Sequence, residues 1–522
     1  MNSEWMSRKL FRKSTALMLA LIMMLTLLAA CSKGTNQSAE NRVIRIGMLY
    51  GSASNEPYYR QQYTDMYEIN HPNITFEFVN AINYDNWRFN QNEEDDPSKA
   101  DPFEQMKAML TGTNPVDIVM IDYNMLRRLT QDNLLLNLDP LVQQDKFDLS
   151  DYVPTVIDGI KQAGDNNLYA LTPTFSASAL FYNKKLFTDA GLDFPTDKME
   201  WSQILDLARQ LSKGEGVDRK FGFAFNSWGG SDGVYDAQTY AQTLQLKMWD
   251  DNGDKMLVNN DKWANAWETI AGLYRDKVLP DQEFMNLWYQ RQYEDDGSGK
   301  RPYYGDLFTS GTVAMMINGS YYINELKTLQ DNSANLEGEM VDWDVVTVPV
   351  HPEAPDIGGN IWFNQLMGIN AKAQNPDDAW EFIKFTNSKE WAKLRARNTN
   401  ELVARKEFLK PLAGMTYNID AFTLLKPIPP SSTDTEKANR EVPGIYEAQS
   451  PSYQLFQDVL AQKLSVKEAL AQWETEGNAI IERLKSGVPN PDGGIGIPRP
   501  LDDTATIEAL EEASGVAEEV VE

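Results

Sequence analysis

The residue types that most often perform chemistry are scarce in this sequence. Its 522 residues include two histidines, His71 and His351, and a single cysteine, Cys31. No H-E-x-x-H pattern and no cysteine-rich spacing of a metal site is present. A Ser-His-Asp triad likewise has little histidine to draw on. The sequence therefore disfavours zinc enzymes and triad hydrolases, and we expect no metal and no cofactor.

Carboxylates are abundant, with 76 Asp and Glu against 48 Lys and Arg and a formal charge of −28. Because two carboxylates suffice for glycoside hydrolysis, a secreted carbohydrate-active enzyme stays open as an alternative. Residues 250–261 place acids at three positions of a calcium loop, but Lys255 stands where that loop needs glycine, so a plain turn is favoured. The charge argues against nucleic acid as a partner, which requires clustered Lys and Arg.

Cys31 ends an amino-terminal pattern typical of export. Basic residues between Arg8 and Lys13 precede the apolar run 16–30. That run is shorter than the roughly 20 residues of a membrane-spanning helix, which favours a cleaved signal over an uncleaved anchor. Leu28-Ala29-Ala30-Cys31 resembles the bacterial lipobox, in which the cysteine receives a diacylglycerol and becomes the first residue. The resemblance implies that Cys31 holds the mature chain on the extracytoplasmic face of the membrane, since two acyl chains anchor stably.

The chain divides by composition into four kinds of segment. We expect a signal peptide over 1–30, a lipidated cysteine and polar tether over 31–42, and an acidic, solvated tail over 501–522. The hydrophobic content of the whole chain, 42%, is ordinary for a globular protein. Without the first 30 residues the chain is still too long for one core, which predicts two or three domains. With no disulfide to form, its stability must come from packing.

Strands and helices alternate along the mature chain. Strands are predicted at 43–50, 74–79, 117–122, 168–171 and 179–182, and helices at 58–70, 101–110, 200–212, 260–275 and 375–397. Asp101-Pro102 and Asn375-Pro376 are helix-start signals. The alternation predicts an α/β fold with largely parallel sheets covered by helices.

Open parallel sheets bind ligands at the carboxyl ends of their strands. The loop after the first predicted strand offers Tyr50 and Ser52, and the loop after the third offers Asp122 and Tyr123. We predict these residues as ligand contacts. Asp122 could instead cap the helix that follows it.

Several segments, in this order, resemble the family 1 extracellular solute-binding proteins of the maltose-binding type, over nearly all of 43 to about 410. They are the segments 164–173, 181–187 (Phe-Tyr-Asn-Lys-Lys-Leu-Phe), 190–193, Trp201, 311–319 (Gly-Thr-Val-Ala-Met-Met-Ile-Asn-Gly) and 379–385. The resemblance implies a two-lobe, periplasmic-binding-protein-like fold of type II with a ligand cleft between the lobes. It assigns 43–172 and 313–357 to lobe 1, and 173–312 and 358–500 to lobe 2.

A sugar site needs polar groups beside flat aromatic rings. Residues 318–322 match the Asn-Gly-Pro-Trp stretch in which the family keeps a stacking aromatic, which implies Tyr321 and its neighbour Tyr322 as contacts. Gly-flanked loops add Trp228, and Asn360 with Trp362. Trp87 and Trp288 are further candidates that could instead cover a core edge, and Tyr182 could be hinge or core.

The resemblance implies a monomeric, lipid-anchored binding protein that captures an oligosaccharide for the membrane permease subunits of an ABC importer. We expect no enzyme activity. Capture of a peptide or another polar solute, and delivery to a membrane sensor, remain open alternatives.

Overall fold

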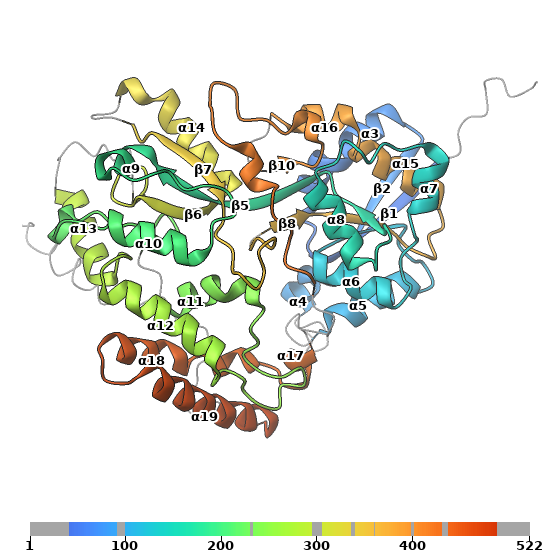
Figure 1. Cartoon of the computed structure of the whole chain (residues 1–522). Coiled ribbons are helices and arrows are strands. Elements are labelled where there is room, and N and C mark those ends of the chain that lie inside the picture. The colour runs from blue at the N-terminus through green and yellow to red at the C-terminus, as the bar shows by residue number, and fades with distance from the viewer. Residues whose placement is uncertain are drawn as a thin grey trace, which may run out of the picture. The chain divides into compact units, whose positions relative to one another are not determined.

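The computed structural model of this chain describes residues 41–90, 100–229, 233–294, 305–335, 340–359, 361–397, 401–430 and 437–487. The predicted signal segment 1–30, Cys31, most of the tether, Asn360 and the tail 501–522 lie outside these residues. The described chain is a mixture of helices and strands (Figure 1).

The strands are β1 (Arg42–Gly51), β2 (Ile74–Asn83), β3 (Ile118–Ile121), β4 (Ala170–Leu171), β5 (Thr174–Asn183), β6 (Met315–Gly319), β7 (Trp343–Thr347), β8 (Ile361–Asn364), β9 (Leu366–Ile369) and β10 (Leu402–Val403). The helices before residue 200 are α2 (Glu56–Tyr59), α3 (Asp65–Asn70), α4 (Tyr84–Asn90), α5 (Pro102–Thr111), α6 (Tyr123–Gln131), α7 (Asp139–Asp145), α8 (Pro154–Ala163) and α9 (Lys184–Ala190). Those after it are α10 (Trp201–Leu211), α11 (Gly233–Ala241), α12 (Asp261–Arg275), α13 (Gln282–Glu294), α14 (Ile323–Asp331), α15 (Pro376–Thr386), α16 (Lys389–Arg395), α17 (Lys437–Glu441), α18 (Pro451–Leu460) and α19 (Val466–Lys485).

Local sequence signals explain where several helices begin. The Asp101 carboxylate accepts hydrogen bonds from the backbone N–H groups of Phe103 and Glu104, which confirms the predicted start of α5. The predicted helix 375–397 is instead two helices, α15 and α16, because Ser388 caps a new helix by accepting from the Trp391 N–H at 3.1 Å.

The described chain divides into a small compact unit, 41–44 with 57–77, and a large one made of 45–56 and everything from 78 onward. In the small unit, His71 stacks on Tyr67 with ring centroids 4.0 Å apart. The Glu68 carboxylate accepts from the Phe76 N–H at 3.0 Å, and the Phe76 carbonyl accepts from Arg60 Nη2 at 2.8 Å. These bonds tie the helical residues of this unit to its strand.

The first sheet has the order β2-β1-β3-β9-β4. β1 and β3 are parallel, with Met48 opposite Met120, so both strands end at the same edge. β9 enters antiparallel between β3 and β4, although it lies more than 200 residues later in the chain than β3. All four residues of β3 and of β9 are buried, which is the pattern of a central strand covered on both faces.

The second sheet is organised by one long strand, β5. Its first half, residues 174–177, pairs with β8 and β10, and its second half, residues 178–183, pairs with β6 and β7. All four pairings are antiparallel. The expectation of mainly parallel sheets is therefore wrong in detail, since only β1 and β3 are parallel among the strand pairs whose register is described.

The pairings also correct the predicted assignment of segments to lobes. Residues 315–319 pair with β5 and pack in the same core as Trp201 and Trp267, so they do not join the 43–172 segment. Conversely, residues 366–369 join the sheet of β1 and β3 instead of the 173–312 segment. A short buried apolar strand fits either sheet, so its sequence does not specify its partner.

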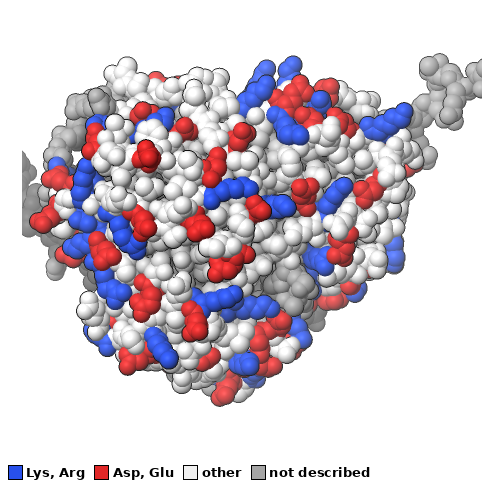
Figure 2. All heavy atoms as spheres, viewed as in Figure 1, with Lys and Arg blue, Asp and Glu red and all other residues white. Residues whose placement is uncertain are grey.

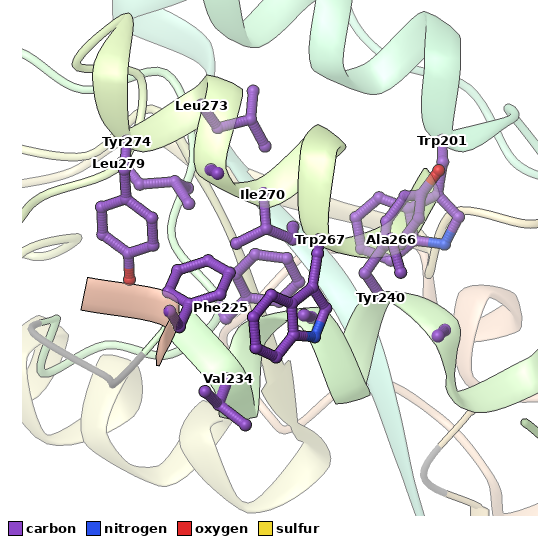
Figure 3. Packing of buried hydrophobic residues seen from close by; sticks show 14 of the residues in the cluster. Trp201, Phe225, Val234, Tyr240, Ala266, Trp267, Ile270, Leu273, Tyr274 and Leu279 are labelled. Carbon is purple, nitrogen blue, oxygen red and sulfur yellow. The ribbon is translucent and has the colours of Figure 1, made fainter. Parts of the chain in front are cut away.

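One large core of the described chain is helical and aromatic. Helices α10, α11, α12, α18 and α19 and the second half of β5 contribute to it, and Figure 3 shows part of it around Trp267 and Ile270. The predicted stripe of α10 is buried there: Trp201, Ile204, Leu205, Ala208 and Leu211. Residues from 437–487 and from 173–312 therefore share this core.

Gly222 makes the closest backbone approach in this core. A Cβ at this position would lie 1.8 Å from the Ala208 carbonyl oxygen of α10, and backbone cannot move aside as a side chain can. We expect Gly222→Ala to lower the free energy of unfolding by roughly 3 kcal/mol, the upper end of the usual cost of overpacking. Chemical denaturation followed by circular dichroism measures this loss.

Gly272 offers the matched control. It lies inside α12, and a Cβ added there would meet no atom of another described segment within 4 Å. Because alanine is about 1 kcal/mol better than glycine in a helix interior, Gly272→Ala is expected to be neutral or stabilising. A loss in Gly222→Ala no larger than that in Gly272→Ala would contradict the close approach.

On the face shown in Figure 2, acidic and basic residues are interspersed and form no large patch of one sign. Residues 250–255 form a turn in which the Asp250 carboxylate accepts from the Asp254 N–H, and Asp254 pairs with Lys485. Within the described residues, no helix has the length and hydropathy to cross a membrane.

Candidate ligand-binding surface

The carboxyl ends of β1 and β3 bring two predicted contacts together. Since Met48 lies opposite Met120, Tyr50 and Asp122 lie side by side at the same edge of the sheet. Tyr50 is 41% exposed, and its ring stacks on that of Tyr84 with centroids 5.9 Å apart and planes 10° from parallel. The two loops that follow β1 and β3 therefore start next to each other.

Polar side chains follow both tyrosines closely in the chain. Ser52 donates its hydroxyl to Asn55 at 2.9 Å, and the Asp85 carboxylate accepts from the Ala53 N–H at 2.7 Å. Trp87 is on the same helix as Tyr84 and is 39% exposed. We call Tyr50, Ser52, Tyr84, Asp85 and Trp87 the β1 edge cluster. Tyr84 and Asp85 were not predicted from the sequence, although they directly follow β2.

The other two predicted contacts at this edge have structural roles. The Asp122 carboxylate accepts from the Met125 N–H at 2.8 Å and caps α6, which is the alternative interpretation of this residue. Tyr123 donates its hydroxyl to the Gly159 carbonyl at 2.7 Å and packs edge-on against Phe363. Burial raises the Tyr123 pKa well above its ordinary value. Asp122 remains exposed, whereas Tyr123 is half-buried and already hydrogen-bonded.

Trp362 lies on β8 opposite Ser176 of β5 and is 62% exposed. In an antiparallel pair, opposite residues point to the same face, and so do residues two apart on one strand. Ser176, Ser178 and Trp362 therefore share one face. Asn364 shares it too, opposite Thr174, and donates its side-chain amide to the Ser176 hydroxyl at 3.0 Å.

Tyr321 lies on that same face. Gly319 is opposite Ser178, so a Cβ on Gly319 would point to the face of Ser178, and it would lie 2.4 Å from the Tyr321 ring. The Tyr321 ring, 58% exposed, thus covers Gly319. We call Ser176, Ser178, Tyr321, Trp362 and Asn364 the β5 face. Its two rings flank the strand at points about 7 Å apart along it.

Trp228 is held by a tight turn. The Asn226 side-chain oxygen accepts from the N–H groups of Trp228 and Gly229, at 2.9 and 2.8 Å, and Gly229 has a φ of +64°. The Trp228 ring lies over Gly305 and is 54% exposed. Trp87, Trp228 and Trp362 are the exposed tryptophans among the described residues.

Three further candidates are buried. Tyr322 is 5% exposed and donates its hydroxyl to Asp306 at 2.7 Å, so its predicted role as a ligand contact is not available in this structure. Trp288 lies in α13 and is buried. Tyr182 packs against Phe187, and burial raises its pKa to about 12. Asn360 lies outside the described residues.

Exposed rings beside hydroxyl, amide and carboxylate groups suit a ligand with both C–H surfaces and hydroxyls. In the described parts of the chain, no three His, Cys, Asp or Glu side chains gather closely enough to hold a metal ion.

The family described as bacterial extracellular solute-binding protein matches residues 58–393. A predicted binding protein of Brucella abortus is 24% identical over 410 residues, which cover 75% of this chain and 83% of that protein.

Three solved structures share the fold. An extracellular solute-binding protein family 1 member from Alicyclobacillus acidocaldarius has 17% identity and a TM-score of 0.56, covering 85% of this chain and 100% of that one. A sugar transporter from Rhizobium etli, in an open conformation, has 20% identity, coverage of 84% and 99%, and a TM-score of 0.54. The sugar-binding protein MalE of Xanthomonas citri has 16% identity, coverage of 85% and 98%, and a TM-score of 0.52.

These similarities confirm the predicted two-lobe, periplasmic-binding-protein-like α/β fold. Because the family match extends over more than half of the sequence, this chain belongs to the bacterial extracellular solute-binding proteins.

Proposed function

We propose that this chain captures an oligosaccharide outside the cell and delivers it to the membrane subunits of an ABC importer. The observation that carries the proposal is the β5 face, where the exposed rings of Tyr321 and Trp362 lie beside Ser176, Ser178 and Asn364. A sugar has C–H faces that stack on rings and hydroxyls that need donors and acceptors. The β5 face offers both, on β5, on its partner strand β8 and in the turn that carries Tyr321.

Proteins of similar fold support the choice of ligand. Two of the three solved structures named above are described as a sugar transporter and as a sugar-binding protein. The ligand contacts that we propose are Tyr50, Ser52, Asp122, Trp228, Tyr321, Asn360 and Trp362, joined by Ser176, Ser178, Asn364, Tyr84 and Trp87.

Contacts from separate segments would also explain how the importer distinguishes the ligand-bound protein from the ligand-free protein. A ligand shifts an open-closed equilibrium only by its differential affinity for the two forms. The β5 face and the β1 edge cluster are built around strands of different sheets, so one oligosaccharide that bound both would favour the closed form.

A thermal-shift screen of the purified protein against oligosaccharides, peptides and amino acids tests the proposal. A true ligand at a hundred times its Kd adds about 2.7 kcal/mol of stability. We expect one class of oligosaccharide to raise the Tm. A shift with a peptide or amino acid alone would contradict the sugar, and release of smaller sugars in proportion to protein would favour the enzyme alternative.

We also propose that Cys31 anchors the mature chain on the extracytoplasmic face of the membrane. Since it is the only cysteine, no other residue of this chain can receive a diacylglycerol that carries an alkyne fatty acid fed to expressing cells. We expect the wild-type chain to incorporate the label and Cys31→Ala to incorporate none. The intact mass of the mature wild-type protein is expected to match a lipidated chain that begins at Cys31.

The matched control is a substitution in the tether, Ser32→Ala, which is expected to retain the label. A wild-type chain that carries no fatty acid, or whose mass retains residues 1–30, would contradict the anchor and leave the sugar proposal intact.

A further inference from the structure

One short loop contacts both the exposed Trp228 ring and the turn that carries the exposed Tyr321. The loop runs from Gly305 to Gly311, and both of these glycines have positive φ values, +73° and +67°. Its second residue, Asp306, is 6% exposed. Asp306 Oδ1 accepts from the N–H groups of Phe308 and Thr309, at 2.9 and 2.8 Å, which fixes the turn.

On one side, the loop holds Trp228. A Cβ at Gly305 would lie 2.8 Å from Cζ3 of the Trp228 ring, so the ring rests on the bare backbone of Gly305. The Leu307 N–H donates to the Ser227 carbonyl at 2.9 Å. The two neighbours of Asp306 in the chain therefore contact the Trp228 ring and the residue that precedes it.

On the other side, the loop holds the turn of Tyr321. Asp306 Oδ2 accepts the Tyr322 hydroxyl at 2.7 Å, and Tyr322 directly follows Tyr321 in the 3₁₀ turn Ser320–Tyr322. The Tyr322 ring packs edge-on against Phe181 at 5.3 Å. The loop, through Gly305, Leu307 and the Asp306 carboxylate, thus contacts both the Trp228 segment and the Tyr322 segment, which are more than 90 residues apart in sequence.

A buried acid is a costly way to fix a loop. Burial raises the pKa of Asp306, and burial together with Asp306 raises the pKa of Glu325. If the Tyr322 hydroxyl is removed, the buried Asp306 carboxylate loses a hydrogen-bond donor. The hydrogen bond between Asp306 and Tyr322 therefore resists small displacements that apolar packing tolerates.

We infer that Asp306 is a positioning residue of the ligand site, which sets the spacing between the Trp228 and Tyr321 rings through Gly305 and Tyr322. The inference deepens the proposed function and rests on it for the identity of the ligand. The inference requires that removal of the Tyr322 hydroxyl displace the ring of a different residue, Trp228.

The test is Tyr322→Phe, which keeps the ring packing and removes only the hydroxyl. The full chain is labelled with fluorotryptophan, and the ¹⁹F signal of Trp228 is identified by its loss in Trp228→Phe. We expect Tyr322→Phe to shift the Trp228 signal in the ligand-free protein and to weaken binding of the screened oligosaccharide about tenfold. Asp306→Asn keeps the Oδ1 acceptor but not the acceptor for Tyr322, and is expected to act in the same way.

The core offers a matched control, because Tyr274 also donates its hydroxyl to a buried carboxylate, Asp236, at 2.6 Å. Tyr274→Phe loses an equivalent bond inside the helical core, so we expect it to lower Tm without moving the Trp228 signal or the Kd. If Tyr322→Phe behaves like Tyr274→Phe, the inference is overturned. If the Trp228 signal shifts but no carbohydrate binds the wild-type protein, the coupling stands and the proposed function fails.

Discussion

Removing both rings of the β5 face, in the double variant Tyr321→Ala with Trp362→Ala, is expected to weaken oligosaccharide binding about a hundredfold. Aromatic anchors in binding sites commonly contribute about 2 kcal/mol or more, and about 2.7 kcal/mol corresponds to a hundredfold change in Kd. Both side chains are mostly exposed, at 58% and 62%, so the folded protein loses little packing. Isothermal titration with the oligosaccharide from the screen measures the change in Kd.

Tyr446 provides the control for this loss. Its ring is 54% exposed, but it lies in the short helix η9 (Ile445–Gln449), which packs on α19, and it contacts Trp249. We expect Tyr446→Ala to leave the Kd unchanged, and Trp362→Phe to retain most of the affinity because it keeps a stacking surface. Equal losses in Tyr446→Ala and the double variant would show that the β5 face has no special role.

The largest loss of stability is expected from Trp473→Ala. Trp473 is fully buried in α19, stacks on Trp267 with centroids 5.5 Å apart, and donates its indole N–H to the Ala448 carbonyl at 2.9 Å. Truncating a buried tryptophan typically costs about 3–5 kcal/mol, and the carbonyl is left without this donor. Chemical denaturation followed by tryptophan fluorescence and circular dichroism measures it.

Trp87→Ala is the matched control, because this tryptophan is 39% exposed on a helix with no buried residue. Its free energy of unfolding is expected to stay within about 1 kcal/mol of wild type. If Trp473→Ala is no more destabilising than Trp87→Ala, then the helical core formed by 437–487 and 173–312 does not hold the domain together.

Secondary structure was predictable where a local signal specified it. The Asp101-Pro102 pair and the apolar stripe of α10 each determine an element through contacts within a few residues, and both were found as predicted. The partners of the strands were not predictable in this way. β6 and β9 are short, apolar and buried, so either could have filled a place in either sheet, and their assignment was reversed.

The candidate site was likewise predictable from the sequence only in part. The loops at the ends of β1 and β3 were found from strand order alone, because parallel strands end at one edge. The side chains were harder: Tyr321 and Tyr322 are neighbours in a 3₁₀ turn, yet one is exposed and the other buried. Ser176, Ser178 and Asn364 were missed because common polar residues become a surface only once β8 pairs with β5.

The most direct test is to identify what the protein binds. The wild-type chain, purified from cells grown on mixed polysaccharides, would be measured by native mass spectrometry and then titrated with the solute that remains bound. We predict one oligosaccharide per chain, recovered chemically unchanged after prolonged incubation, whose binding is lost in Tyr321→Ala with Trp362→Ala. A bound peptide or amino acid, a hydrolysed sugar, or full binding by the double variant would contradict the proposed function.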